Sequence, residues 1–201
     1  MKYLPLVLAL IATAAQGADE PRLYAVTGVE AGDALNVRET PSPSAPVIGT
    51  LAPGAVIEVT DRTATRRWGR VNTGEQAGWV SMRFLEAQGR PIDNYNMKVG
   101  MRCFGTEPFW SLSYEAGGVT LSQMDTGDTT LTVEIAQDSG IPDDQRRMIR
   151  LSGPDGPGVA YVAQGECSDG MSDRRYALSI ALMEGPATPL LTGCCTLQPA
   201  D

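Results

Sequence analysis

Apolar and polar residues alternate over short runs in this chain, and this pattern constrains its fold more than any other feature. Three sets of apolar side chains each share one parity, and so one face of a strand: Trp110, Leu112 and Tyr114; Leu131, Val133 and Ile135; and Tyr176, Leu178, Ile180 and Leu182. Turn-forming sequences such as "EAGG", "DTGD" and "SGPDGPG" separate the runs. No window shows a sustained helical period. The sequence therefore predicts an all-β protein.

The chain is long enough for two small domains. It has 201 residues, and all four cysteines lie after residue 90. A polar stretch with Gly, Pro and Asn, "QGRPIDNYN", has the composition of a linker. We therefore expect one β domain at residues 23–87, a linker at 88–97 and a second β domain at 98–201.

The N-terminus has the features of a secretory signal peptide. Lys2 supplies the positive charge, a short apolar stretch follows, and "AQG" provides small residues for cleavage before Ala18. The apolar stretch is too short to span a bilayer, and no later segment approaches 18 apolar residues. We expect residues 1–17 to be removed and the mature protein to be periplasmic or secreted, without membrane insertion.

Charge and composition exclude several classes of function. The formal charge is −8, from 24 acidic against 16 basic residues, so nucleic acid and anionic membranes are unfavourable partners. The chain contains no histidine, which removes Ser-His-Asp triads, Cys-His proteases and the usual zinc enzymes. We therefore expect no enzyme, no catalytic residue, no cofactor and no metal site.

Two long stretches of the first domain resemble a bacterial SH3 (SH3b) domain over residues 23–87. They are "LNVRETPSPSAPVIGTLAPGAVIEV" and "RRWGRVNTGEQAGWVSMRFL". The resemblance implies a small SH3-like barrel that binds cell-wall peptides or glycans and does not catalyse a reaction.

Four polar or aromatic positions of this domain are of interest for binding. Asn36 and Arg38 alternate with apolar residues and should point towards solvent or ligand. Trp68 is either the rim of the core or a platform for a ligand, whereas Trp79 should pack in the core beside Val80.

The second domain resembles a family of exported bacterial proteins of unknown function. The resemblance covers residues 101–197 and depends on "CFGTEPFWSLSY" and "CSDGMSDRRYALSIAL", which match the patterns G-[NT]-E-P-F-W and C-x-D-G-M-S-D. It implies a small antiparallel, META-like β-barrel and no particular activity. Pro108 restricts Glu107 to an extended conformation ahead of the strand. Glu107 is either a solvated or arginine-paired carboxylate or, with Trp110, part of a ligand pocket.

The four cysteines indicate disulfides, since their number is even and the chain is expected to be exported. Cys194 and Cys195 are neighbours on one strand, so they face opposite sides and should have different partners. Three connectivities are possible, including a vicinal Cys194–Cys195 redox pair. In the resembling family the equivalents of Cys167 and Cys194 are kept, which implies Cys167–Cys194 and Cys103–Cys195 pairs.

The acidic stretch "DGMSD" has three interpretations. Its spacing does not fit an EF-hand calcium loop, although Asp169, Asp173 and Ser172 could assist a cation. A catalytic role for the two aspartates lacks a neighbouring nucleophile or base. A tight turn explains the Asp-Gly pair and the short polar side chains. The arginines at 174 and 175 then either neutralise the aspartates in a surface ion-pair network, which we favour, or line the mouth of a binding site.

Together these features predict an exported, non-enzymatic envelope protein. Its SH3b domain would bind peptidoglycan or another cell-wall peptide or glycan, and its barrel would bind an unknown ligand or an envelope protein. We expect a monomer. The alternative is a periplasmic inhibitor or regulator of cell-wall lytic enzymes. A hydrolase that uses Glu107 or Asp169 is disfavoured because the chain has no histidine.

Overall fold

The computed structural model describes residues 21–89, 92–95, 97–116, 118–141, 144 and 146–197. The predicted signal peptide lies outside these residues. In the described part, the regular elements are strands apart from one 3-10 turn at Met82–Phe84, so the all-β prediction is confirmed. The described residues contain no helix that is long and apolar enough to cross a membrane.

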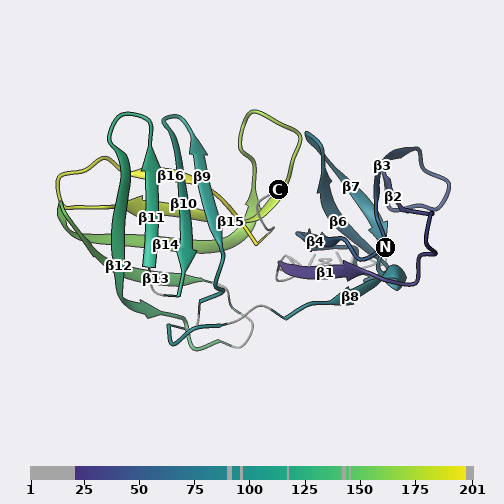
Figure 1. The fold of residues 1–201 in the computed structure, drawn as a ribbon, viewed down its shortest axis with the longest axis horizontal. Helices are drawn as coiled ribbons and strands as arrows, with labels where there is room; N and C mark the ends of the chain where they lie inside the picture. Colours follow the sequence, from purple (N-terminus) through teal and green to yellow (C-terminus); the bar gives the residue numbers. More distant parts are fainter. Residues whose placement is uncertain are drawn as a thin grey trace, which may run out of the picture.

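The first domain has an SH3-like arrangement of two small sheets (Figure 1). One sheet has the order β4-β1-β8 and the other β3-β2-β7-β6-β5. Alternating valines of the inner strands, Val37, Val71 and Val80, are completely buried between them. The strands are β1 (Arg22–Val26), β2 (Leu35–Arg38), β3 (Val47–Leu51), β4 (Val56–Val59), β5 (Asp61–Arg62), β6 (Trp68–Thr73), β7 (Gln76–Ser81) and β8 (Leu85–Ala87).

The prediction that Trp79 packs in the core beside Val80 is wrong. Val80 is fully buried, whereas Trp79 is half-buried on the opposite face of β7. Successive side chains of a strand point to opposite faces, so two neighbours cannot both enter the core. Trp79 instead lies opposite Arg38 and Arg70 on the outer face, with the Arg70 guanidinium carbon 5.9 Å from the ring centroid.

The second domain is a closed antiparallel barrel of eight strands, with the order β10-β11-β12-β13-β14-β15-β16-β9 (Figure 1). Its inward-facing side chains form one apolar core, in which Tyr114, Leu121 and Leu182 are completely buried. The strands are β9 (Arg102–Thr106), β10 (Phe109–Glu115), β11 (Gly118–Gln123), β12 (Gly127–Gln137), β13 (Arg147–Gly153), β14 (Gly156–Cys167), β15 (Tyr176–Met183) and β16 (Leu191–Thr196).

The expected alternation continues through Val133 on β12 and then stops. The register with β13 shifts between Val133 and Ile135, which is a β-bulge. The extra residue moves the following side chains to the other face. Ala136 therefore packs against the barrel core, and Ile135 does not take the place that its parity predicts.

The stretch predicted to be a polar linker packs against the barrel. The Asp93 carboxylate accepts hydrogen bonds from the buried Tyr114 hydroxyl and from the backbone N–H groups of Tyr95 (2.9 Å) and Met97 (3.1 Å). Met97 is buried in the barrel core cluster, which Leu23 of β1 also joins. Apolar side chains of the two domains are therefore in contact, in addition to the chain that connects the domains.

Both disulfides lie in the barrel domain and use all four cysteines. Cys103 of β9 bonds to Cys195, its direct partner on β16. Cys167, at the end of β14, bonds to Cys194, so the two neighbouring cysteines face opposite sides as expected. This is the connectivity that the family resemblance implied, and it leaves no vicinal pair.

Replacing the Cys167–Cys194 disulfide by two alanines should lower the free energy of unfolding by about 3 to 4 kcal/mol. The bond closes a loop of 27 residues and so restricts the unfolded chain. Urea unfolding measures the difference. The Cys103/Cys195 double alanine variant, which opens a separation of 92 residues, is the comparison and should lose about 1 kcal/mol more. Reactive thiols in the denatured wild-type protein would contradict the assignment.

Candidate functional site

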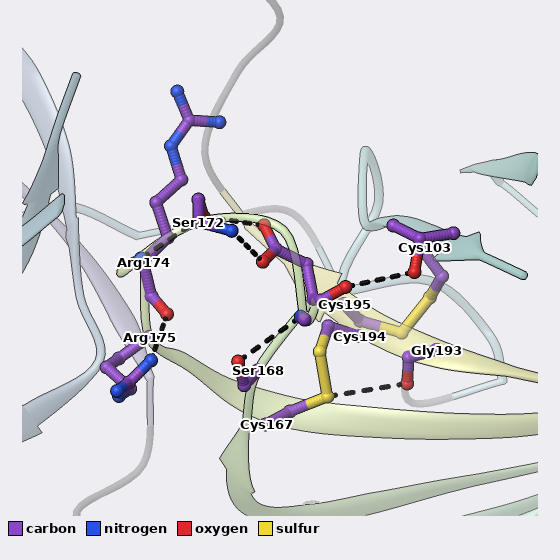
Figure 2. The surroundings of a disulfide bond; sticks show 12 residues. Cys103, Cys167, Ser168, Ser172, Arg174, Arg175, Gly193, Cys194 and Cys195 are labelled. Carbon is purple, nitrogen blue, oxygen red and sulfur yellow. Dashed lines mark hydrogen bonds between the residues drawn. A yellow bond between two sulfur atoms is a disulfide. The ribbon is translucent and has the colours of Figure 1, made fainter. Parts of the chain in front are cut away.

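Residues 168–175, here called the docking loop, connect β14 to β15 beside the Cys167–Cys194 disulfide (Figure 2). The loop begins as a tight turn around Asp169. Its carboxylate accepts hydrogen bonds from the backbone N–H groups of Met171 (3.0 Å) and Ser172 (2.9 Å) and from the Ser172 hydroxyl (2.8 Å). Gly170 has a φ of 71°, which a glycine adopts without strain. The sequence interpretation of this stretch as a turn therefore agrees with the geometry.

The second half of the docking loop lies along the β6–β7 hairpin of the first domain and pairs with its backbone. The Asp173 N–H donates to the Glu75 carbonyl (2.8 Å), and the Ala77 N–H donates to the Asp173 carbonyl (3.2 Å). The Asn72 side chain then binds Arg175 twice, accepting from its N–H (2.9 Å) and donating to its carbonyl (3.1 Å). The loop is thus held like a short added strand.

The two arginines of the docking loop pair with acids outside the loop. Arg174 lies 3.2 Å from Glu75 of the first domain, and Arg175 lies 3.8 Å from Glu166 of β14. Neither arginine forms an ion pair with an aspartate of the loop among the described contacts, although the charge of Arg174 helps to lower the pKa of Asp169. One aspartate is occupied by the N–H and hydroxyl groups of the turn, and the other meets the first domain through its backbone.

A second contact between the domains lies on β4. The Glu58 side chain is buried (4% exposed) and accepts a hydrogen bond from the Thr196 hydroxyl and one from the Leu197 N–H (3.1 Å). A buried carboxylate is costly unless such donors satisfy it, so this contact has a defined geometry. Together with the docking loop and the apolar contact of Leu23, it fixes the first domain to the barrel.

An open groove with a cavity volume of about 1000 Å³ lies between these two contacts. One wall belongs to the first domain, the floor to the barrel, and the other wall to the docking loop. The lining comprises Leu51, Ile57, Glu58 and residues 72–75; residues 102–106, 109–111 and 122–124; Asp169, Met171, Ser172 and Arg174; and Tyr176 and Thr196.

The floor of the groove presents the outward side chains of β9. Arg102, Phe104 and Thr106 alternate with residues that face the barrel core. Ser111 on β10 lies opposite Phe104, and Ser122 on β11 lies opposite Ser111, so they continue the middle row across the sheet. The middle of the floor therefore combines one aromatic ring with two hydroxyl groups.

One end of the groove is apolar. Phe109, opposite Thr106, is 52% exposed, and Met124 and Met171 are 82% and 68% exposed. Large apolar side chains this exposed, gathered at the edge of a concave site, are typical of an interaction surface.

Burial and charge act against each other where the docking loop meets β15. Burial raises the pKa of the Tyr176 hydroxyl, although its hydrogen bond with Arg174 opposes this. For Arg174, burial acts to lower the pKa, but the contact with Tyr176 and the charges of Glu75 and Asp169 outweigh it and raise the pKa. The Tyr176 ring also meets Phe104 edge-on, with centroids 5.1 Å apart. Tyr176 and Arg174 are therefore the protonated, fixed part of the groove wall.

The structure brings only two of the predicted site residues of the barrel to the groove, Trp110 and Asp169. Trp110 is 4% exposed, and most of its indole packs in the barrel core. Glu107 lies in the exposed β9–β10 turn, where its peptide bond to Pro108 is cis, and Asp173 is exposed on the docking loop. The described residues contain no group of three or more acidic or cysteine side chains that could hold a metal ion.

The candidate residues of the first domain lie away from the groove. Asn36 is exposed on β2. Arg38 is half-buried, and its guanidinium donates to the Ala45 carbonyl (2.6 Å). Trp68 is half-buried on the outer face of β6, opposite Ser81.

Sequence reasoning missed the residues that join the two domains, above all Glu58, Asn72 and Glu75. The cluster of charged residues at 166–175 could have indicated a contact surface, because a turn alone does not require so many charges. Nothing comparable marks Glu58 or Asn72, which are ordinary polar residues in short strands.

Comparison with known families supports the assignment of the first domain. Residues 33–86 match the family model of the bacterial SH3 domain. No curated protein and no solved structure matches the chain. The chain therefore has a region, residues 33–86, that is similar to bacterial SH3 domains, followed by a closed eight-stranded barrel cross-linked by two disulfides. The resemblance of residues 101–197 to an exported family stays a prediction.

Replacing Asn72 by alanine should lower the free energy of unfolding by about 1 to 3 kcal/mol. The variant removes both hydrogen bonds to Arg175 and leaves its partly buried backbone groups without these partners. The matched control is Asn36→Ala, at an exposed position of the same domain, which should change stability by less than about 0.5 kcal/mol. Urea unfolding compares the two, and equal losses would contradict the role of Asn72.

The turn around Asp169 should contribute to stability in a pH-dependent way. Burial alone would raise the pKa of Asp169, but the hydrogen bonds from Ser172 and Met171 and the charge of Arg174 hold it below the ordinary value of 3.8. A carboxyl whose pKa is lower in the folded state stabilises the fold fully above its unfolded pKa and loses this effect as the pH falls. The difference in unfolding free energy between wild type and Asp169→Asn should therefore shrink below about pH 4. A difference that is constant from pH 7 to pH 3 would contradict this.

Proposed function

We propose that this protein is an exported, non-enzymatic binding protein of the bacterial envelope that holds a cell-wall peptide or glycan in the groove between its two domains. The observation that carries the proposal is the groove itself. Its volume of about 1000 Å³ lies at the upper end of the range of ligand sites, and one of its walls belongs to the domain that matches the bacterial SH3 family.

The chemistry of the groove supports binding of an extended polar chain. Hydroxyl groups at Ser111 and Ser122 can hydrogen-bond to amides or sugars, and Phe104 and Phe109 offer aromatic surface beside them. Apolar pockets that contain a few placed polar groups are the usual form of a ligand site. The groove does not have to form on ligand binding, because the contacts between the domains at the docking loop and at Glu58 are already made.

The acidic side chains of the groove support a role in binding rather than catalysis. Glu58 and Asp169 both accept hydrogen bonds from backbone N–H and hydroxyl groups, and Glu75 pairs with Arg174, so all three serve the structure. The absence of histidine from the chain removes the commonest general base. The two disulfides and the predicted signal peptide support a location outside the cytoplasm.

Co-sedimentation of the full chain with purified peptidoglycan tests the proposal. Met124→Ser should lower the affinity roughly fivefold. Its thioether is exposed at the apolar end of the groove in the free protein and would be buried against the bound ligand, and the serine would lose that apolar contact. Met148→Ser is the matched control, since Met148 is exposed on β13 and lies outside the groove lining. It should bind like the wild type.

Two outcomes would go against wall binding. A wild-type protein that stays in the supernatant would reject the proposal. The alternative function, inhibition of a wall-lytic enzyme, is favoured by the exposed apolar end formed by Phe109, Met124 and Met171, which would also suit a protein partner. It predicts that the full chain slows clearing of a peptidoglycan suspension by a muramidase without sedimenting with peptidoglycan alone.

A further inference from the structure

Arg102 is an exposed cation on the floor of the groove. It projects from the outer face of β9, where it lies opposite Ser113 of β10 and Thr196 of β16. Within the residues that the structure describes, its exposed guanidinium makes no hydrogen bond or ion pair. The other arginine of the groove, Arg174, already donates to the Gly74 carbonyl (2.6 Å) and pairs with Glu75. Arg102 is therefore available to an anionic group of a ligand.

No ion pair joins Arg102 to the acid at the same end of the groove among the described contacts. The Glu58 carboxylate accepts a hydrogen bond from Thr196, which is the strand partner of Arg102. Both of its carboxylate oxygens are occupied, one by the Thr196 hydroxyl and the other by the Leu197 N–H. Glu58 has no ion pair with Arg102 among the described contacts, so its role is to join the domains.

The distance from this cation to the apolar end suits a short extended peptide. Arg102 and Thr106 are four residues apart on β9, which is roughly 13 Å in an extended strand. Phe109 lies directly opposite Thr106. A bound strand of about four residues would therefore span the groove from its charged to its apolar end.

The middle of the floor favours a peptide over a fatty acyl chain. A ligand with a carboxylate at one end and an apolar group at the other could be of either kind. Between the two ends, however, the row of Phe104, Ser111 and Ser122 offers two hydroxyl groups. These match the amide groups of a peptide, whereas a methylene chain would leave them without partners.

We propose that the groove recognises a short peptide by its free C-terminal carboxylate, which binds Arg102, and by an apolar side chain at about the fourth residue from the C-terminus, which binds among Phe109, Met124 and Met171. This rests on the proposed function, because it names the chemistry of the cell-wall peptide that the same groove would bind. Arginine suits a carboxylate because its planar guanidinium binds both oxygens at once.

The test uses the tetrapeptide acetyl-Leu-Ser-Ala-Ala as the free acid and as the C-terminal amide, with binding to the full chain measured by calorimetry. The free acid should bind at least about tenfold more tightly than the amide, as expected for a charge-assisted pair. Arg102→Gln should abolish this preference, and Arg102→Lys should keep part of it. The matched control is Arg150→Gln, which removes an exposed arginine of β13 outside the groove lining and should leave the preference unchanged.

A second arm separates this inference from wall binding in general. Peptidoglycan is treated with carbodiimide and ammonia, so that its free carboxylates become amides, and co-sedimentation of the full chain is compared before and after. Loss of at least fivefold in affinity supports the inference, and Arg102→Gln should be insensitive to the treatment.

The outcomes are distinct. Equal binding of acid and amide by the wild type, or binding of neither, overturns the carboxylate inference. Equal sedimentation before and after amidation also overturns it, although wall binding itself would stand. A preference for the peptide acid without any sedimentation would reject the wall as the ligand while the recognition of a C-terminal carboxylate stands.

Discussion

The pairing of the docking loop with the β6–β7 hairpin is the contact on which the groove depends. Asp173 and Arg175 meet the first domain through their backbone N–H and carbonyl groups, so the contact depends on the loop's path more than on its side chains. That path is fixed at its base by the Cys167–Cys194 disulfide (Figure 2). At its start it is fixed by the turn around Asp169. A loop without these restraints would lose more conformational entropy on docking.

The two domains reach each other by three physically different means. Apolar packing places Leu23 and Met97 in the barrel core cluster, backbone pairing holds the docking loop, and a buried carboxylate, Glu58, binds the C-terminal end of β16. The ion pairs that also cross between the domains, Arg174–Glu75 and Arg70–Glu166, are partly exposed and add little to stability. The groove between these contacts is consequently a fixed feature of the fold, lined by both domains.

The sequence was most informative where a single local rule decides the outcome. Alternation gave the strands, and the neighbouring positions of Cys194 and Cys195 required separate partners. Prediction failed at Ile135 because the bulge after Val133 reversed the parity of the strand. It failed at Trp79 because alternation allows only one of two neighbours into the core, and that residue is Val80. Neither the bulge nor the choice of buried neighbour has a signature in a single sequence.

By itself, the sequence determined the all-β class, the bacterial SH3 region and the turn that carries Asp169, because each depends on residues close together in the chain. Only the tertiary structure decided where a ligand could bind. Asn72 and Arg175 are 103 residues apart, and Arg102 faces the groove with Glu58 at the same end. Such contacts follow from how two folded domains dock, which the composition and periodicity of the sequence do not predict.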